Sequence, residues 1–449
     1  MAQSARAIGP QLGERMAVSA DTSVAPRSYN RVHLWLSMVF LAIGFASVAW
    51  TRLNIAIILP EVLQGIGVTS LAVGGVLATV SVLGTGFAEP FMGHLSDRIG
   101  RRAALTIGLG GFSLFCLLTA LAQNEPEMVV IRIAMGVLQG LFIPTYLAFV
   151  GGTFERRRGF AIESLVGMFT IGTALNPLMT RAIFSGAGNA WQAPSIVYGV
   201  FGLVIALGVF ALGASGIYDR ARKKQPEGVV NPMATPAHEP WVKQFDRSMI
   251  LLVLTMICWG LSQYAYLGLY VTYLRQAQSF SLESATTVAS IAGWCAYAAA
   301  FLIGWTSDQI GRRRTLLITG VIGALVSYPL FAFSTSFWPA VIFGVIFQAS
   351  NGSFFGLGVA YAQDMARGRG LGGRSGMTTG AGHIMSGLAG GVAGAIAAPL
   401  GYQAVGVELT LLCVVMVVCI YLTVDRAYEA RVAERRRLAA AAPAATTLT

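Results

Sequence analysis

Arg52 is the residue of this sequence whose type and position most clearly suggest a chemistry. It is the only charged residue in the apolar run 34–60, which is long enough to cross a bilayer as a helix. An arginine at membrane depth costs at least about 2.5 kcal/mol and normally faces a protein interior or a wet cavity. Its planar guanidinium matches a carboxylate, so Arg52 is a candidate anchor for an organic anion. The alternative is that the long side chain of Arg52 reaches the outer headgroups, although Arg52 lies about 12 Å of helix rise before Pro60.

Three other ionisable residues inside apolar runs are candidates for a functional role. Arg132, near the start of the run 128–151, lies at a depth comparable with Arg52, and it either contacts a substrate or orders neighbouring carbonyls. His383, in the run 375–399, is either a proton site, because histidine changes charge near neutral pH, or a neutral histidine among packed helices. Glu89 is either a proton carrier or the partner of arginines in the following loop.

Uncharged polar and aromatic side chains in the second part of the sequence could contact a hydroxyl group or a ring of a substrate. They are Gln263, Tyr264, Tyr270, Gln348, Asn351 and Phe355, of which we select Gln263, Tyr270 and Asn351 as candidates. The alternative role for aromatic residues in such runs is packing or anchoring at the membrane interface.

The composition places these residues in a membrane protein. Hydrophobic residues make up 55% of the 449 residues and charged residues only 11%, against about 25% in soluble domains. The net charge of +11 is explained by basic loops, so we expect no nucleic-acid partner. The five cysteines lie in apolar runs without paired spacing, as small core residues, and predict neither disulfides nor zinc. The sequence lacks nucleotide loops, metal-ligand clusters and nucleophile–base patterns, so we expect no enzyme activity, metal or cofactor.

Twelve apolar runs form two sets of six. They predict an all-α integral membrane protein, with twelve transmembrane helices in two six-helix bundles. The runs are 34–60, 71–94, 103–121, 128–151, 160–184 and 195–218, then 249–274, 285–305, 315–333, 338–363, 375–399 and 405–424. We expect bundles at 34–218 and 248–425, a cytoplasmic linker at 219–247, and cytoplasmic tails at 1–33 and 426–449.

Basic residues predict the orientation. They gather in loops on one side, at 98–102, 156–158, 223–224, 312–314 and 367–374, and this side is therefore predicted to be cytoplasmic. The opposite connections carry no lysine or arginine apart from Arg275. We expect a multi-pass protein of the plasma membrane, in contact with lipid, with both termini in the cytoplasm.

A ten-residue motif occurs once in each set. Residues 93–102 read GHLSDRIGRR and residues 304–313 read GWTSDQIGRR, with seven of ten positions identical, which indicates duplication. Its aspartate can accept from an arginine or a helix N-terminus and so hold one conformation, while the glycines permit a tight turn. Alternatively, these charges only fix orientation. The candidate latch residues are Gly93, Asp97, Arg98, Gly100, Arg101, Asp308, Gly311 and Arg312.

This motif closely resembles the loop between helices two and three of the major facilitator superfamily, in which two halves rock around a central site. Within that superfamily, several segments resemble the anion:cation symporter family. WTRLNIA at 50–56 is similar to its first-helix signature, and RIAMGVLQG at 132–140, followed by Pro144, to its fourth helix. ERRRG at 155–159 resembles its next loop, and GHIMSG at 382–387 a segment of helix eleven.

The resemblance implies a secondary active transporter that moves a small organic anion, a carboxylate or sugar acid, by alternating access with proton coupling. We expect a monomer. The candidate substrate-binding residues are Arg52, Asn54, Arg132, Gln139, Gln263, Tyr270, Asn351 and His383. Thr51 and Gln139 replace acids that the family usually carries, and neither releases a proton at physiological pH. His383 and Glu89 are the candidates for a displaced proton site.

Three alternatives stay open. A multidrug or metabolite exporter of the same superfamily would usually carry a Gly-Pro pair in its fifth helix, whereas this sequence reads GMFTIGTALNP at 167–177. An anion exchanger or uniporter would use the same site without a driving proton. A membrane sensor would need an output domain, and the sequence shows none that we recognise.

Overall fold

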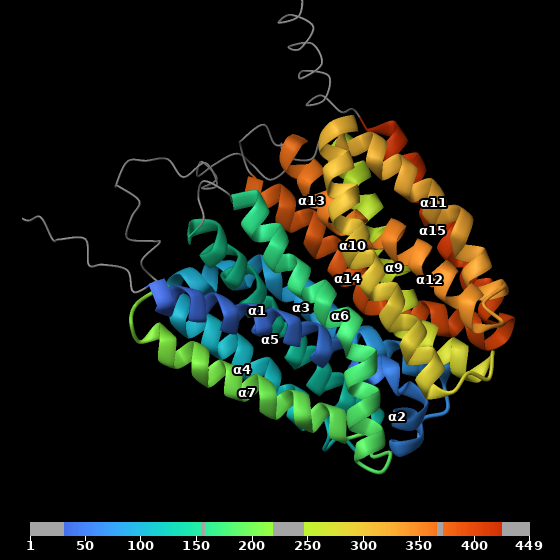
Figure 1. Cartoon of the computed structure of the whole chain (residues 1–449), viewed down its shortest axis with the longest axis horizontal. Helices are drawn as coiled ribbons and strands as arrows, with labels where there is room; N and C mark the ends of the chain where they lie inside the picture. Colours follow the sequence, from blue (N-terminus) through green and yellow to red (C-terminus); the bar gives the residue numbers. More distant parts are fainter. Residues whose placement is uncertain (1–30, 154–157, 219–246, 366–370, 424–449) are drawn as a thin grey trace, which may run out of the picture.

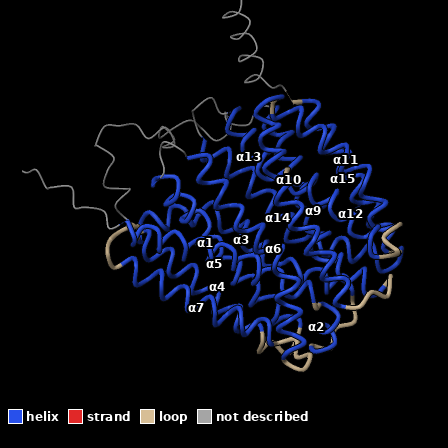
Figure 2. Tube along the Cα trace, in the orientation of Figure 1, coloured by secondary structure: helices blue, strands red, loops and turns tan. Residues whose placement is uncertain are grey.

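The computed structural model describes residues 31–153, 158–218, 247–365 and 371–423, and these ranges are all helical apart from short turns (Figures 1 and 2). The first half contains α1 (Arg31–Ile57), α2 (Leu59–Gly65), α3 (Leu71–Ile99), α4 (Arg101–Thr119), α5 (Glu125–Thr153), α6 (Arg158–Gly186) and α7 (Ala193–Gly213). The second half contains α9 (Arg247–Gln276), α10 (Leu282–Ile310), α11 (Arg312–Ala332), α12 (Phe337–Gly352), α13 (Phe354–Met365), α14 (Leu371–Leu400) and α15 (Tyr402–Leu422).

Eleven segments of the described chain are long and apolar enough to cross a membrane, in agreement with the predicted all-α membrane fold. The predicted run 160–184 falls in α6, which has 29 residues but is not among the eleven. It carries Arg158, Glu163 and Arg181 in its sequence. The predicted run 338–363 corresponds to two helices, α12 and α13, which a turn at Ser353 separates.

The duplicated motif folds in the same way in both halves. Gly100 lies between α3 and α4 with φ of 85°, and Gly311 lies between α10 and α11 with φ of 98°. Each glycine N–H donates to the carbonyl of the motif serine, at 3.1 Å for Ser96 and 3.0 Å for Ser307. These positive φ values favour glycine, because it has no Cβ to clash with the backbone. The repeated glycine is thus explained by a tight turn that joins two helices.

The two halves meet mainly along two pairs of helices. The first half lies to the left and below in Figure 1, and the second half to the right and above. α3 packs on α14, and α6 packs on α10. The backbones approach closely at Gly75 and Gly390, where a Cβ on either residue would overlap the carbonyl of the other. Small residues permit this contact, as is usual between helices in a membrane.

Buried apolar residues form two clusters. The larger one runs through both halves and includes Leu53 and Ile57 of α1 as well as Tyr266 of α9. The smaller one lies within the first half and includes Phe142 and Tyr146 of α5. Four of the five cysteines are buried, but Cys295 is exposed on α10, so the prediction that all five are core residues was wrong.

Ion pairs join the halves at the end of the molecule where α2 lies. Arg275, near the end of α9, donates with both terminal nitrogens to Glu61 of α2, at 2.8 and 2.5 Å. Arg181 of α6 lies 3.5 Å from a carboxylate oxygen of Glu283 on α10. Arg275 is the one basic residue that broke the charge pattern of its side, and its place against Glu61 gives that exception a structural reason.

Candidate functional site

Arg52 lies at the centre of a buried polar cluster between the halves. It is on α1 and only 1% exposed. Its Nε and Nη2 both donate to Gln139 Oε1 of α5, at 3.1 and 2.9 Å. Nη2 also donates to Thr85 Oγ1 of α3 at 3.1 Å, and Nη1 donates to Tyr264 OH of α9 at 3.2 Å. The guanidinium therefore points into the protein, not toward the headgroups.

Arg132 is a second buried arginine beside the first. It is 1% exposed, and its Nη2 donates to Arg52 O at 2.5 Å and to Ala78 O at 3.5 Å. Its Nε is buried without a hydrogen-bond partner among the described residues. Of the two roles open in the sequence, the contacts match the ordering of backbone carbonyls.

The charge of these two guanidiniums is not balanced by any acid of the described residues. In the part of the chain that the structure describes, no carboxylate forms an ion pair with Arg52 or Arg132. Removing a charge from water costs several kcal/mol per ion, and neutral acceptors compensate only in part. The cluster is therefore a place where a small anion would be favoured.

Gln139 occupies the part of the guanidinium that a carboxylate would use. The Nε and Nη2 edge forms parallel hydrogen bonds with carboxylates, and here both donors converge on the amide oxygen of Gln139. The amide nitrogen of Gln139 donates in turn to Thr51 Oγ1 at 3.2 Å. Thr51 and Gln139, the two positions at which the anion:cation symporter family usually carries acids, are thus in direct contact, and both side chains are neutral here.

Aromatic rings extend from the central guanidinium toward α14. The Phe169 ring lies against it, with 5.7 Å from Arg52 Cζ to the ring centroid. Tyr264 is followed by Trp259, with 6.4 Å between centroids, and Trp259 by Phe355, at 5.1 Å. Phe355 then stacks on the ring of His383 at 5.5 Å. The substrate candidates on α1 and α14 are therefore linked by a continuous row of rings.

His383 and Glu89 form a pair across the two halves. His383 Nδ1 of α14 lies 3.1 Å from Glu89 Oε2 of α3, and the side chains are 9% and 13% exposed. The sequence left Glu89 as a proton carrier or as a partner of loop arginines, and its described contact is with His383. Both candidates for a proton site are thus adjacent, at a contact between the halves.

Four predicted substrate residues are bonded elsewhere. Asn54 donates to Ser195 Oγ at 2.8 Å, inside the first half. Tyr270 donates to Ala340 O at 2.9 Å, inside the second half. Gln263 and Asn351 join a network with Ser262 and Gln348, in which Gln263 Nε2 donates to Gln348 Oε1 at 2.6 Å and Asn351 Nδ2 donates to Gln263 Oε1 at 3.1 Å. None of these bonds reaches Arg52.

The structure also shows residues that the sequence interpretation missed. Thr85 and Phe169 contact Arg52, but each is an ordinary helix residue by type and gave no signal. Glu408 of α15 is a further carboxylate inside a membrane-spanning segment, and its Oε2 is buried without a partner among the described residues. The signal for Glu408 was present, since it is a lone acid in the apolar run 405–424.

The loop latch is only partly described. Gly100 and Gly311 form the turns given above, Arg98 is exposed, and Arg312 Nη1 donates to Ser307 Oγ. Gly93 lies within α3, but the side chains of Asp97 and Asp308 are outside the described part of the chain, so a latch contact by either aspartate stays a prediction.

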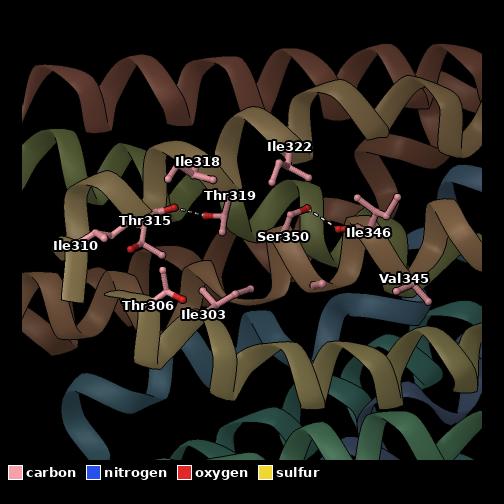
Figure 3. Close-up of a pocket in the computed structure, with 11 residues that line it drawn as sticks. Ile303, Thr306, Ile310, Thr315, Ile318, Thr319, Ile322, Val345, Ile346 and Ser350 are labelled. Carbon is pink, nitrogen blue, oxygen red and sulfur yellow. Dashed lines mark hydrogen bonds between the residues drawn. The ribbon is translucent and has the colours of Figure 1, made fainter. Parts of the chain in front are cut away.

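A larger cavity of about 340 Å³ lies between α10, α11 and α12, away from Arg52. Figure 3 shows that its lining is mainly isoleucine, valine and threonine, and the hydroxyls of Thr319 and Ser350 donate to carbonyls of their own helices, Thr315 O and Ile346 O. It presents no charged group to a ligand, and it is not the candidate site.

The fold and the central cluster define a membrane transport protein of two related halves. A family model described as Major Facilitator Superfamily matches residues 39–294 and 252–448, and the chain belongs to this superfamily.

Curated relatives and solved structures agree with this assignment. The chain is 24% identical over 344 residues to the gallate transporter of Pseudomonas putida, covering 71% of this chain and 76% of the relative. It is 26% identical over 301 residues to multidrug resistance protein MdtG of Salmonella paratyphi C, covering 66% and 72%. A bacterial homolog of the human lysosomal transporter Spinster, in an inward-facing and occupied conformation, superposes with a TM-score of 0.60 at 14% identity, covering 89% of this chain and 96% of that one.

Proposed function

We propose that this major facilitator transporter moves a small organic anion across the plasma membrane by alternating access, and that Arg52 holds the carboxylate of its substrate. The observation that carries the proposal is the pair of buried guanidiniums, Arg52 and Arg132, which no carboxylate of the described residues neutralises. A bound carboxylate would supply the missing charge and match the planar fork of Arg52.

The name of one curated relative supports an organic anion as the substrate. The relative from Pseudomonas putida is named a gallate transporter, and gallate carries a carboxylate. The similarity to a multidrug resistance protein keeps an exporter as the second candidate. The buried Arg52 cluster favours the anion, because a site for varied apolar drugs gains nothing from an unpaired buried charge.

Proton coupling is the finer part of the proposal. His383 and Glu89 are adjacent and belong to different halves, so a proton bound there changes the attraction between the halves. A transporter whose cycle depends on this pair would link proton binding to the movement of the halves. If the pair does not carry protons, the same site serves an exchanger or a uniporter.

Transport and binding by Arg52 variants test the proposal. A thermal-shift screen of the purified protein against small carboxylates, sugar acids and sulfonates would identify a ligand, since a ligand at 100 times its Kd stabilises by about 2.7 kcal/mol. We expect Arg52→Ala to abolish binding and uptake of that ligand while the protein still inserts into the membrane. Arg52→Lys should rescue poorly, because lysine retains the charge but lacks the planar fork.

Arg181→Ala is the matched control, because it also removes an arginine from a helix. Arg181 belongs to an exposed pair, and exposed pairs contribute only about 0–1 kcal/mol. Near-normal ligand binding by Arg52→Ala would refute the role of Arg52. Stabilisation by uncharged apolar drugs in place of acids would favour the exporter.

A further inference from the structure

A small cavity lies between the two halves, next to the Arg52 cluster on the side toward α2. Its volume is about 30 Å³, enough for about two waters. Residues of both halves line it, among them Leu53 and Asn176 from the first half and Tyr266 and Tyr270 from the second.

Two polar groups on the wall of this cavity have no hydrogen-bond partner in the part of the chain that the structure describes. Asn176 is 1% exposed and Tyr266 is 3% exposed. Asn176 Oδ1 accepts from Thr180 Oγ1 at 3.0 Å, but its Nδ2 and the hydroxyl of Tyr266 make no hydrogen bond to any described residue. A buried donor without a partner costs about 1–3 kcal/mol, so a polar group that enters the cavity is favoured. The two donors lie on opposite halves.

The cavity is placed to receive the far end of a molecule held by Arg52. Leu53, the next residue after Arg52 on α1, lines it. On α6, Phe169 contacts the guanidinium and Asn176 lies seven residues further, which is about 10 Å of helix rise on the same face. A small organic acid can span a distance of this order, so its carboxylate can contact Arg52 while its other end enters the cavity.

We propose that Asn176 and Tyr266 form a second subsite, which binds a hydroxyl or carbonyl oxygen of the substrate remote from its carboxylate. This inference rests on the proposed function and narrows it to acids with a second polar group. The amide nitrogen of Asn176 donates, and the Tyr266 hydroxyl donates or accepts, so the ligand atom must be able to accept a hydrogen bond. A hydroxyl group of the substrate in this cavity would accept from these donors and tie both halves to one molecule.

Matched pairs of acids test the subsite on the purified full-length protein. Benzoate is compared with 4-hydroxybenzoate, and hexanoate with 6-hydroxyhexanoate, by the concentration dependence of the thermal shift. We expect the hydroxylated member of at least one pair to bind about 10- to 100-fold more tightly, because the plain acid leaves the buried donors unpaired.

Two variants assign that preference to the subsite. Asn176→Leu and Tyr266→Phe should each reduce the preference for the hydroxylated acid about 10-fold, while the affinity for the plain acid changes little. Tyr266→Phe removes only one oxygen, so it keeps the packing of the ring against Tyr270. Tyr146→Phe is the control, because Tyr146 also has a buried hydroxyl without a partner among the described residues, but it does not line the cavity.

The outcomes separate this inference from the proposed function. Acids that bind through Arg52 without any preference for the hydroxylated member would overturn the subsite and leave the anion site intact, with the cavity holding water only. A preference that survives both Asn176→Leu and Tyr266→Phe would also overturn it. If Arg52→Ala binds the acids as well as the natural protein does, the proposed function falls and the subsite falls with it.

Discussion

Replacement of Gln139 by glutamate is the sharpest test of how the central arginine binds an anion. Gln139 is fully buried, and its amide oxygen accepts from both Nε and Nη2 of Arg52. Gln139→Glu keeps the size of the side chain but places a carboxylate on the same edge of the guanidinium. An incoming carboxylate must then compete with a fixed internal one.

The structure allows the size of this effect to be worked out. Breaking one partner away from a buried ion pair costs about 3–5 kcal/mol, and each 1.4 kcal/mol is a factor of ten in affinity. We therefore expect Gln139→Glu to weaken anion binding at least about 100-fold when the new carboxylate is ionised. When that carboxylate is protonated it resembles the amide, so the affinity should recover as the pH falls.

The assay is equilibrium binding of the anion identified by the thermal-shift screen, measured from pH 5 to pH 9 for the variant and the natural protein. Gln139→Leu is the control, because it removes the amide without adding a charge, and the ratio of its affinity to that of the natural protein should not depend on pH through this position. Unchanged affinity of Gln139→Glu at high pH would refute the assignment of this guanidinium edge to the substrate.

Three further predictions concern the movement of the halves and the driving ion. His383→Gln should leave anion binding and counterflow intact but reduce accumulation driven by a proton gradient in liposomes; equal accumulation by both proteins would make His383 structural. Glu61→Gln breaks the bidentate pair with Arg275, so the halves should separate more often at the α2 end. We expect a cysteine placed at that end to be labelled about 2- to 5-fold faster. Glu283→Gln is the control, because it belongs to a more exposed pair and should change the labelling rate less. Asp97→Asn should reduce transport more than equilibrium binding, and equal losses would indicate that Asp97 maintains the fold instead.

The sequence predicted the helical fold and the burial of Arg52 inside the protein, because both leave strong local signals. Apolar runs of about 20 residues define membrane helices, and a lone charge such as Arg52 in one of them is costly enough to require a reason. The duplicated loop was equally clear, since Gly100 and Gly311 occupy positive φ angles that other residues rarely adopt.

The face of the helix on which each residue lies explains why Asn54 does not contact Arg52. Successive residues of an α-helix are about 100° apart, so Asn54 lies about 200° around α1 from Arg52 and faces the other way, against Ser195. Arg132 and Gln139, seven residues apart, lie on one face of α5 and both contact Arg52. This periodicity was readable, whereas no property of a single helix shows which face meets its neighbour.

The central contacts explain why binding and movement would be linked in this protein. Arg52 of the first half donates to Tyr264 of the second, and His383 of the second half pairs with Glu89 of the first. A rigid-body opening of the halves must break such contacts, and a buried donor left without a partner costs about 1–3 kcal/mol. Under the proposed function, an anion on Arg52 would replace one of these contacts, and a proton on His383 would strengthen another. Substrate and proton would then act on the same equilibrium between closed and open halves, which is the condition for coupling.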